Sequence, residues 1–143
     1  MVLRMNWLTW SLLSALFAAL TAILAKIGVT GVNSNVATAV RTTFVLGFTW
    51  LLAVPGLHES PLMSLSRRTW LFLALSGLAT GASWICYFRA LQLGKASQVA
   101  PVDKLSVVLV LVFAALFLGE KLSLQEYAGA GLIAAGALLI AFK

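Results

Sequence analysis

The sequence is poor in charged residues and in cysteine, and each shortage excludes a class of protein. Only 10% of its 143 residues are charged, whereas 62% are hydrophobic. A soluble domain carries roughly 25% charged residues, so this chain has too few to cover a surface that faces water. The single cysteine, Cys86, excludes an internal disulfide and a multi-cysteine metal site. We therefore expect an integral membrane protein without a metal or other cofactor.

Acidic residues are also scarce, which argues against an enzyme. The four acids, Glu59, Asp103, Glu120 and Glu126, are spread over different regions, whereas a catalytic site needs clustered acids, histidines or a nucleophile beside a base. The net charge of +6 would suggest nucleic acid in a soluble protein. Here the bases are scattered between apolar runs with no basic stripe, so we expect them to face lipid headgroups, with no nucleic-acid partner.

What the chain does have is long apolar segments separated by glycine, proline and polar residues. A bilayer is crossed by about 20 apolar residues in a helix, and several segments reach that length. The expected transmembrane helices span residues 6–27, 35–54, 67–93, 96–118 and 124–142. The sequence thus predicts an all-α membrane protein with a single five-helix domain over residues 1–143.

Capping residues support these boundaries. Ser34 or Asn35 can cap the second helix and Ser66 the third. Ser123 and Glu126 have the spacing of a capping box at the start of the fifth, and Gly119 suits the end of the fourth.

The fourth segment carries charge beside its long apolar run. Asp103 and Lys104 stand inside the expected helix, where an ionisable residue is by default a candidate for function. Neighbouring residues on a helix do not face each other, so we expect Asp103 to pair with Arg41 or Arg89. Such a pair either fixes helix packing or belongs to a substrate or ion pathway. Asp103 would instead serve the helix dipole if the helix began near residue 100.

Pro101 precedes this charge pair and has two interpretations. In a continuous helix it removes a hydrogen-bond donor and clashes with the carbonyl of Ser97. Irregular backbone at membrane depth is tolerated only where protein or a water-filled cavity covers it, so a kink here predicts a substrate or ion site. Alternatively, Pro101 occupies the first turn of the helix, where proline is harmless.

Aromatic residues gather near the end of the third helix. Trp84, Tyr87 and Phe88 share one helix face, either as an aromatic wall for a substrate or, more commonly, as a packing stripe. The intramembrane charges comprise the bases Arg41, Arg89 and Lys104 and the single acid Asp103. This balance favours an anionic or zwitterionic solute.

Small residues recur at helical spacing in two places. In lipid, such residues let helix backbones approach closely. They are Gly77 and Gly81 in the third helix and Gly129, Ala130, Ala134 and Gly136 in the fifth. The spacing predicts a helix contact, either within the chain or across a dimer seam.

An odd number of spans places the two termini on opposite sides of the membrane. The bases near the two sides are Arg4, Arg67, Arg68 and Lys121 against Lys26, Arg89, Lys95 and Lys143. The positive-inside rule needs an asymmetry of bases, and this count offers none. We therefore predict insertion in both orientations and an antiparallel homodimer, which would resemble the inverted repeats of secondary transporters. The alternative is one orientation, set by the deeper bases Arg41 and Lys104.

The stretch from Tyr87 to Ile140 resembles the second part of an EamA domain, the repeat unit of the drug/metabolite transporter superfamily. The matching features are Ala90-Leu91 with Ala96-Ser97, the Leu118-to-Leu122 turn and a last helix rich in glycine and alanine. Arg41 in the second helix fits more loosely.

This resemblance implies a function. Most members carry two five-helix repeats in inverted orientation, and the chain is similar to single-repeat members, which need a partner. It implies a secondary transporter that moves a small metabolite by alternating access as a dimer, in the plasma membrane of a bacterium or archaeon. The alternative is a non-transporting or hetero-oligomeric membrane subunit, such as a component of a flippase for lipid-linked substrates.

Two departures limit what the resemblance implies. Many members have a Glu-Pro pair in the fourth helix, where this chain has Ser106-Val107. The related four-helix multidrug-resistance proteins use an acid in their first helix, and residues 7–27 contain none. Proton-coupled cation export by that route is therefore not expected.

Overall fold

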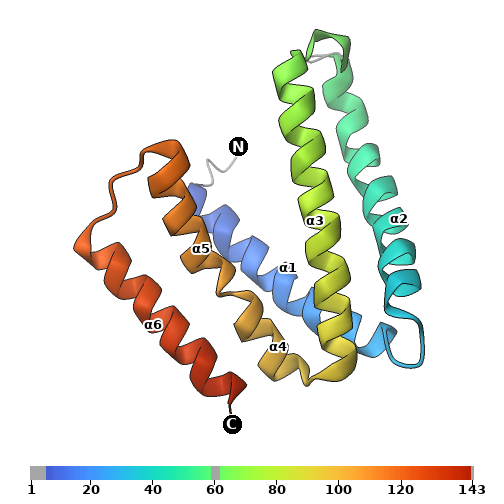
Figure 1. The fold of residues 1–143 in the computed structure, drawn as a ribbon. Coiled ribbons are helices and arrows are strands. Elements are labelled where there is room, and N and C mark those ends of the chain that lie inside the picture. Colours follow the sequence, from blue (N-terminus) through green and yellow to red (C-terminus); the bar gives the residue numbers. More distant parts are fainter. Residues whose placement is uncertain (1–5, 59–61, 143) are drawn as a thin grey trace. The chain divides into compact units, whose positions relative to one another are not determined.

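The computed structural model describes residues 6–58 and 62–142, which form helices and the short segments that join them (Figure 1). Five helical spans in this part of the chain are long and apolar enough to cross a membrane. This confirms the expected set of transmembrane helices, and the described residues contain no strand. Arg4, Glu59 and Lys143, counted above among the charged residues, lie outside the described residues.

The helices follow the order expected from the sequence. They are α1 (Trp7–Gly28), α2 (Ser34–Ala53), η1 (Val54–His58), η2 (Leu62–Ser64), α3 (Arg67–Leu93), α4 (Ala96–Asp103), α5 (Ser106–Phe113), η3 (Ala114–Leu118) and α6 (Leu124–Ala141). Their ends lie within one residue of the predicted ranges. The main difference is that the fourth span is divided into α4, α5 and η3.

The start of α2 differs from the prediction that Ser34 or Asn35 caps it. The cap is Asn33, whose extended backbone directs its side-chain oxygen toward the amides of Asn35, at 2.9 Å, and Val36, at 3.4 Å. Ser34 already lies in the first turn and is buried. An asparagine side chain reaches the free amides of the first turn as well as serine does, so the three adjacent polar residues could not be ranked from sequence alone.

The other three predicted helix ends are confirmed. The Ser66 hydroxyl accepts a hydrogen bond from the Thr69 amide at 3.1 Å. Ser123 and Glu126 form the complete capping box, in which each side chain bonds the other residue's backbone amide. Gly119 ends the fourth span in the left-handed region, with φ of 68°, where glycine carries no steric penalty.

The fourth span is interrupted where the sequence places a proline and a charge pair. Pro101 lies inside α4, not in its first turn, because the helix begins five residues earlier at Ala96. The amides of Lys104 and Leu105 then bond carbonyls only three residues back, at 3.1 and 3.0 Å. This tighter turn separates α4 from α5, so the interpretation of Pro101 as a harmless first-turn residue is wrong.

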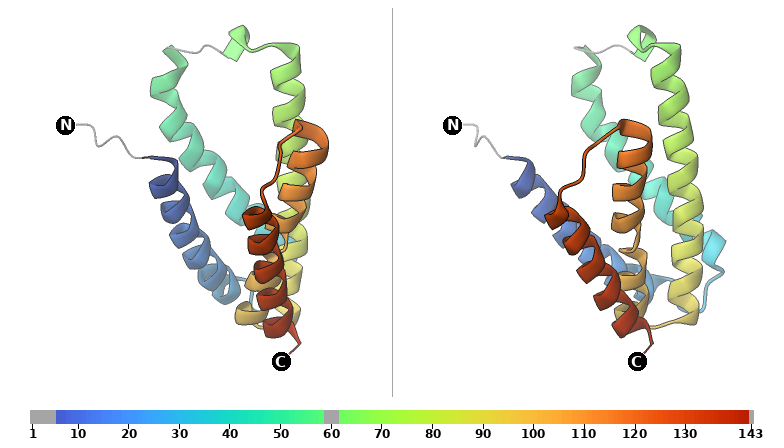
Figure 2. Two further views of the ribbon diagram at one scale, coloured as in Figure 1. Left: turned by 90° about the vertical axis from the view of Figure 1, so that its left-hand side faces the viewer. Right: turned by 60° about the vertical axis from the view of Figure 1, so that its left-hand side comes forward.

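The chain divides into two compact units, one formed by residues 1–27 and 93–143 and the other by residues 28–92. In the first, α6 packs against α4 and α5, as Figures 1 and 2 show. Its buried apolar residues are Ala22, Ala25, Ala114, Ala130 and Ala137. All of them are alanines, which is the composition expected where helices approach closely in lipid.

The small residues of α6 do not contribute equally. Ala130 and Ala137 are buried, while Gly129, Ala134 and Gly136 are half-buried. A Cβ atom added to Gly129 or Gly136 meets nothing within 4 Å in the described part of its unit. Ala130 and Ala137 are therefore the small residues of α6 that pack most closely within this unit.

In the second unit, α2 and α3 form a hairpin closed by η1 and η2 (Figure 1). Hydroxyl groups along α2 bond backbone carbonyls one turn earlier, including Thr38 to Ser34 and Thr42 to Thr38, both at 2.8 Å. Such bonds satisfy polar groups that lipid cannot. A Cβ atom added to Gly77 or Gly81 meets nothing within 4 Å in the described part of this unit, so no helix of the hairpin packs on that face.

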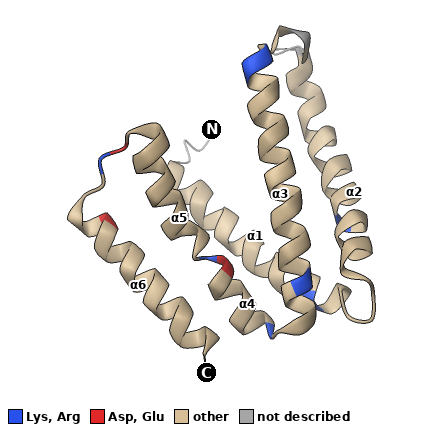
Figure 3. Cartoon of the chain, in the orientation of Figure 1, with Lys and Arg blue, Asp and Glu red and all other residues tan. Residues whose placement is uncertain are grey.

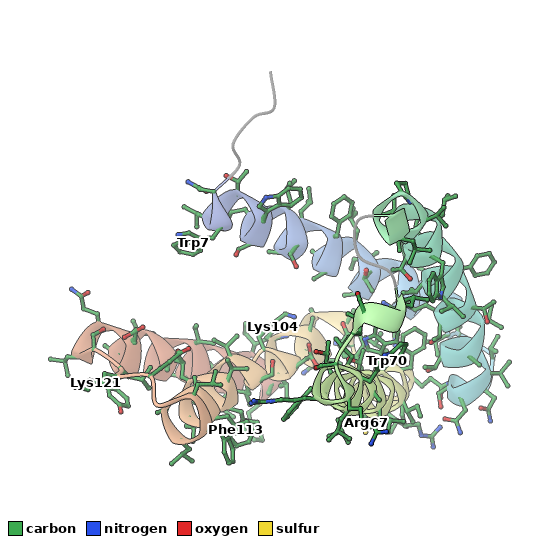
Figure 4. The ribbon with its side chains drawn as sticks, turned by 90° about the horizontal axis from the view of Figure 1, so that it is seen from above. Trp7, Arg67, Trp70, Lys104, Phe113 and Lys121 are labelled. Carbon is green, nitrogen blue, oxygen red and sulfur yellow. The ribbon has the colours of Figure 1, made fainter. Side chains whose placement is uncertain are left out.

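Large apolar side chains cover the outside of the helices. Leu132 and Leu139 on α6, and Phe142 just after it, are each at least 76% exposed. Phe113 of α5, labelled in Figure 4, contacts Phe117 at a ring distance of 5.8 Å and is also exposed. Water would strongly disfavour so much exposed apolar surface, whereas the acyl chains of a bilayer accept it.

Enlarging a buried alanine of α6 should disturb the packing of this unit. We expect Ala137→Leu to destabilise the protein by about 1–3 kcal/mol, because overpacking forces neighbouring helices apart. Ala135→Leu, on the exposed face two residues away, is the matched control and should have little effect. Thermal unfolding in detergent measures both. Equal stability of the two variants would contradict a packed role for the Ala137 face.

Candidate functional site

Arg41 lies on the α2–α3 hairpin, on the side of α2 that faces aromatic residues of α3. Its guanidinium carbon lies 4.1 Å from the centre of the Trp84 ring and 5.6 Å from that of Phe88. Both distances are within the range of a cation–π interaction. Trp84 and Phe88 are four residues apart on α3, so one helical turn presents both rings to the same cation.

The aromatic residues predicted as a wall or a packing stripe take different positions. Phe88 is buried, with 3% of its surface exposed. Trp84 and Tyr87 are half-buried. The stripe therefore supports a cation, and Trp84 and Tyr87 keep part of their surface accessible.

Arg41 has no acidic partner in the described part of its own unit. Between Gly28 and Gln92 the sequence contains a single acid, Glu59, which lies outside the described residues. Arg41 is seven residues into α2, or about 10 Å along the helix axis. A charge at this depth in a membrane span is costly unless it is solvated or paired.

Arg89 is more exposed and belongs to a different cluster. Its guanidinium donates to the side-chain oxygen of Gln92 at 3.1 Å. The Gln92 amide in turn donates to the carbonyls of Val29, at 3.3 Å, and Val32. Arg89 thus helps to hold the loop that precedes α2 against the end of α3.

Lys26 forms a related contact in the other unit. Its ammonium donates to the carbonyl of Gly94 at 2.8 Å, just beyond the last residue of α3. A cation at this position also complements the negative end of the helix dipole.

Asp103 and Lys104 lie at the interruption between α4 and α5, where Figure 3 shows an acidic residue beside a basic one. Their side chains form an ion pair of 3.4 Å. The prediction that these neighbours do not face each other is wrong, because the regular helix ends at Asp103 and the long lysine side chain turns back. The prediction that Asp103 pairs with Arg41 or Arg89 stays a prediction.

The backbone around Asp103 also differs from the expected dipole arrangement. The helix begins at Ala96, not near residue 100, so Asp103 is the last residue of α4. That end of a helix disfavours a negative charge, whereas the start of the next helix favours it. Asp103 lies two residues before the N-cap of α5, Leu105, so its charge is balanced by Lys104 and by the α5 dipole.

Sequence reasoning missed Gln92 and Lys26 as contact residues, and it placed Phe88 in the aromatic stripe without identifying what its ring contacts. Gln92 and Lys26 are polar groups at the ends of apolar helices, a position that indicates a hydrogen bond to a neighbouring loop when lipid surrounds the helix. Phe88 stands one turn from Trp84, and that spacing alone predicts that both rings can reach one partner. The identity of the partner, Arg41, is not encoded in local spacing.

Comparison with known proteins identifies relatives over almost the whole chain. Residues 5–142 match the model of the EamA-like transporter family. A protein of Sinorhizobium sp. named "Uncharacterized transporter in cobO 3'region" is 57% identical over 137 residues, covering 95% of this chain and 96% of that protein. No solved structure matches the chain.

The contact between Arg41 and Trp84 can be measured by a double-mutant cycle. We expect a coupling energy of about 0.5–2 kcal/mol between Arg41→Leu and Trp84→Leu in detergent unfolding, the range of a partly desolvated cation–π pair. The matched control is Arg68 with Phe72, a pair at 5.8 Å in which Arg68 is exposed at the start of α3. That pair should couple more weakly. Coupling no stronger than in the control would argue that Arg41 and Trp84 are not in contact.

Proposed function

Because the chain belongs to the EamA-like transporter family, we propose that it moves a small anionic or zwitterionic metabolite by alternating access as an antiparallel homodimer. Membership of the family, and the transporter name of a relative with 57% identity, support a transporter and not an enzyme. The family and the relative do not specify the class of solute, the mechanism or the assembly, and these are what we propose.

The observation that carries this proposal is the interruption of the fourth span. Lys104 lies eight residues from the start of α4, or about 12 Å along the axis, well inside a 23-residue span. Secondary transporters use discontinuous helices at substrate and ion sites, because free backbone groups and helix ends can bind charge there. We propose that Pro101, Asp103 and Lys104 border the solute pathway for this reason.

The bases of the other unit support an anionic or zwitterionic solute. Arg41 lies about 10 Å into α2, a depth similar to that of Lys104 in its own span. Helices that cross a bilayer in sequence alternate in direction, so α2 and α4 should enter from the same side. We propose that Arg41, Trp84 and Tyr87 face the pathway, while Arg89 contributes positive charge near its entrance.

Assembly as a dimer follows from the number of spans and the balance of bases. Five spans correspond to one repeat, and transporters of this kind are built from two halves in inverted orientation. Equal numbers of bases near the two sides remove the usual preference for one orientation. The open face of α3 at Gly77 and Gly81 is suited to close approach of a helix from a second copy.

The antiparallel arrangement can be tested by accessibility labelling in native membranes. In a Cys86→Ser background, Ser64→Cys and Val32→Cys place single thiols beyond opposite ends of α2. We expect each thiol to be labelled in similar amounts from both sides of the membrane. Labelling of Ser64→Cys from one side and Val32→Cys only from the other would demonstrate one orientation and exclude the antiparallel homodimer.

The role of Asp103 can be tested in reconstituted vesicles. We expect Asp103→Asn to insert normally but to reduce uptake of a transported amino acid or small carboxylate by about tenfold, or roughly 1.4 kcal/mol, because Lys104 loses its counter-ion. Glu120→Gln, which removes an exposed acid between helices, is the control and should leave uptake unchanged. Full uptake by Asp103→Asn would contradict a position of this carboxylate on the pathway.

A further inference from the structure

The Arg41 guanidinium lies over aromatic rings, and the described part of its own unit offers it no acidic partner. Aromatic rings interact with the face of a guanidinium, whereas its N–H groups point outward in its plane. Arg41 contacts the Trp84 and Phe88 rings at 4.1 and 5.6 Å, and these rings offer no oxygen acceptor for its N–H groups. A fixed guanidinium edge matches the two oxygens of a carboxylate or phosphate.

Three of the four acids belong to the other unit, and each has its own surroundings there. Asp103 is paired with Lys104, and Glu126 is engaged by the backbone and hydroxyl of Ser123. Glu120 is exposed in the segment before α6.

We propose that Arg41 binds an oxyanion that comes from outside the chain, a carboxylate or phosphate group, with the rest of the ligand against Trp84 and Tyr87. Both aromatic side chains are half-buried and retain accessible surface, whereas Phe88 is covered and serves only to hold the cation. The site thus selects a small molecule with an oxyanion at one end and an apolar or aromatic body. This inference rests on the proposed transport function, for which it names the group that is recognised.

A lysine should not replace Arg41 fully at such a site. Its ammonium is a compact point charge without the planar fork that stacks on a ring and donates two parallel hydrogen bonds. We therefore expect a graded loss of affinity for the oxyanion. The loss should be small for Arg41→Lys, which keeps the charge, and large for Arg41→Gln, which removes it.

The test is equilibrium binding of radiolabelled benzoate to the purified full-length chain in maltoside micelles, which contain no phosphate. We expect saturable binding that unlabelled benzoate and phenyl phosphate displace and that benzamide, the uncharged isostere, does not. Arg41→Gln should weaken binding by roughly tenfold or more, since a hydrogen-bonded charge pair is lost, and Arg41→Lys by less. Arg68→Gln should bind normally, because Arg68 also lies over a ring but is exposed at the start of α3.

A lipid headgroup carries the same chemistry as a soluble oxyanion, and a second arm distinguishes the two sources. Native mass spectrometry after addition of phosphatidylglycerol measures retained lipid in the wild type and in Arg41→Gln. Benzoate binding that depends on Arg41 assigns the site to a solute. Retention of lipid that depends on Arg41, without benzoate binding, assigns it to a headgroup phosphate. Neither ligand binding in an Arg41-dependent manner would overturn the proposal.

The outcome separates this site from the transport function. Benzoate binding without uptake of any tested solute into vesicles would contradict the proposed transport and leave the oxyanion site intact. Normal uptake of carboxylates by Arg41→Gln would contradict the site and leave transport intact. Size-exclusion chromatography reports folding of each variant. If Arg41→Gln does not fold, Arg41→Lys and Trp84→Leu carry the test, and unchanged benzoate affinity in both would overturn the proposal.

Discussion

Lipid supplies no hydrogen bonds, and this constraint governs the structure of the chain. Each backbone group inside the bilayer must find a partner within the protein, so the spans are helices. The same demand accounts for the threonine hydroxyls of α2 that bond carbonyls one turn earlier. It also accounts for Gln92 and Lys26, which bond carbonyls of loops at the helix ends. The interruption between α4 and α5 is therefore a place where another requirement competes with backbone satisfaction.

Lipid also provides no hydrophobic force between helices, because acyl chains are as apolar as leucine. Contacts must come from close packing, and in the unit that contains α4, α5 and α6 the buried apolar residues are alanines. The large side chains face outward, where they contact lipid. A soluble helical protein shows the opposite distribution, with leucine and phenylalanine in the core. The core of this protein is accordingly small, and much of its apolar content forms its surface.

Charge is the third consequence of the same environment. Two arrangements make intramembrane charge tolerable in this chain. Asp103 and Lys104 neutralise each other at a helix interruption, whereas Arg41 is supported by the faces of aromatic rings. The first arrangement leaves little net charge, whereas the second leaves a net positive charge against aromatic rings.

The sequence by itself determined the number of spans, nearly all of their ends and the membrane environment, because these depend on local apolar length, capping and glycine or proline. It also indicated the family through the segment from Tyr87 to Ile140. Only the tertiary structure decided which residues touch: that Arg41 lies on Trp84 and Phe88, that Asp103 pairs with its neighbour and that Ala130 and Ala137, not the glycines, are buried. Helical periodicity defines a face but not the partner of that face. Pro101 indicates a kink, but it does not show that the helix ends at Asp103. Contacts between segments far apart in the chain depend on how whole helices pack, which local spacing does not encode.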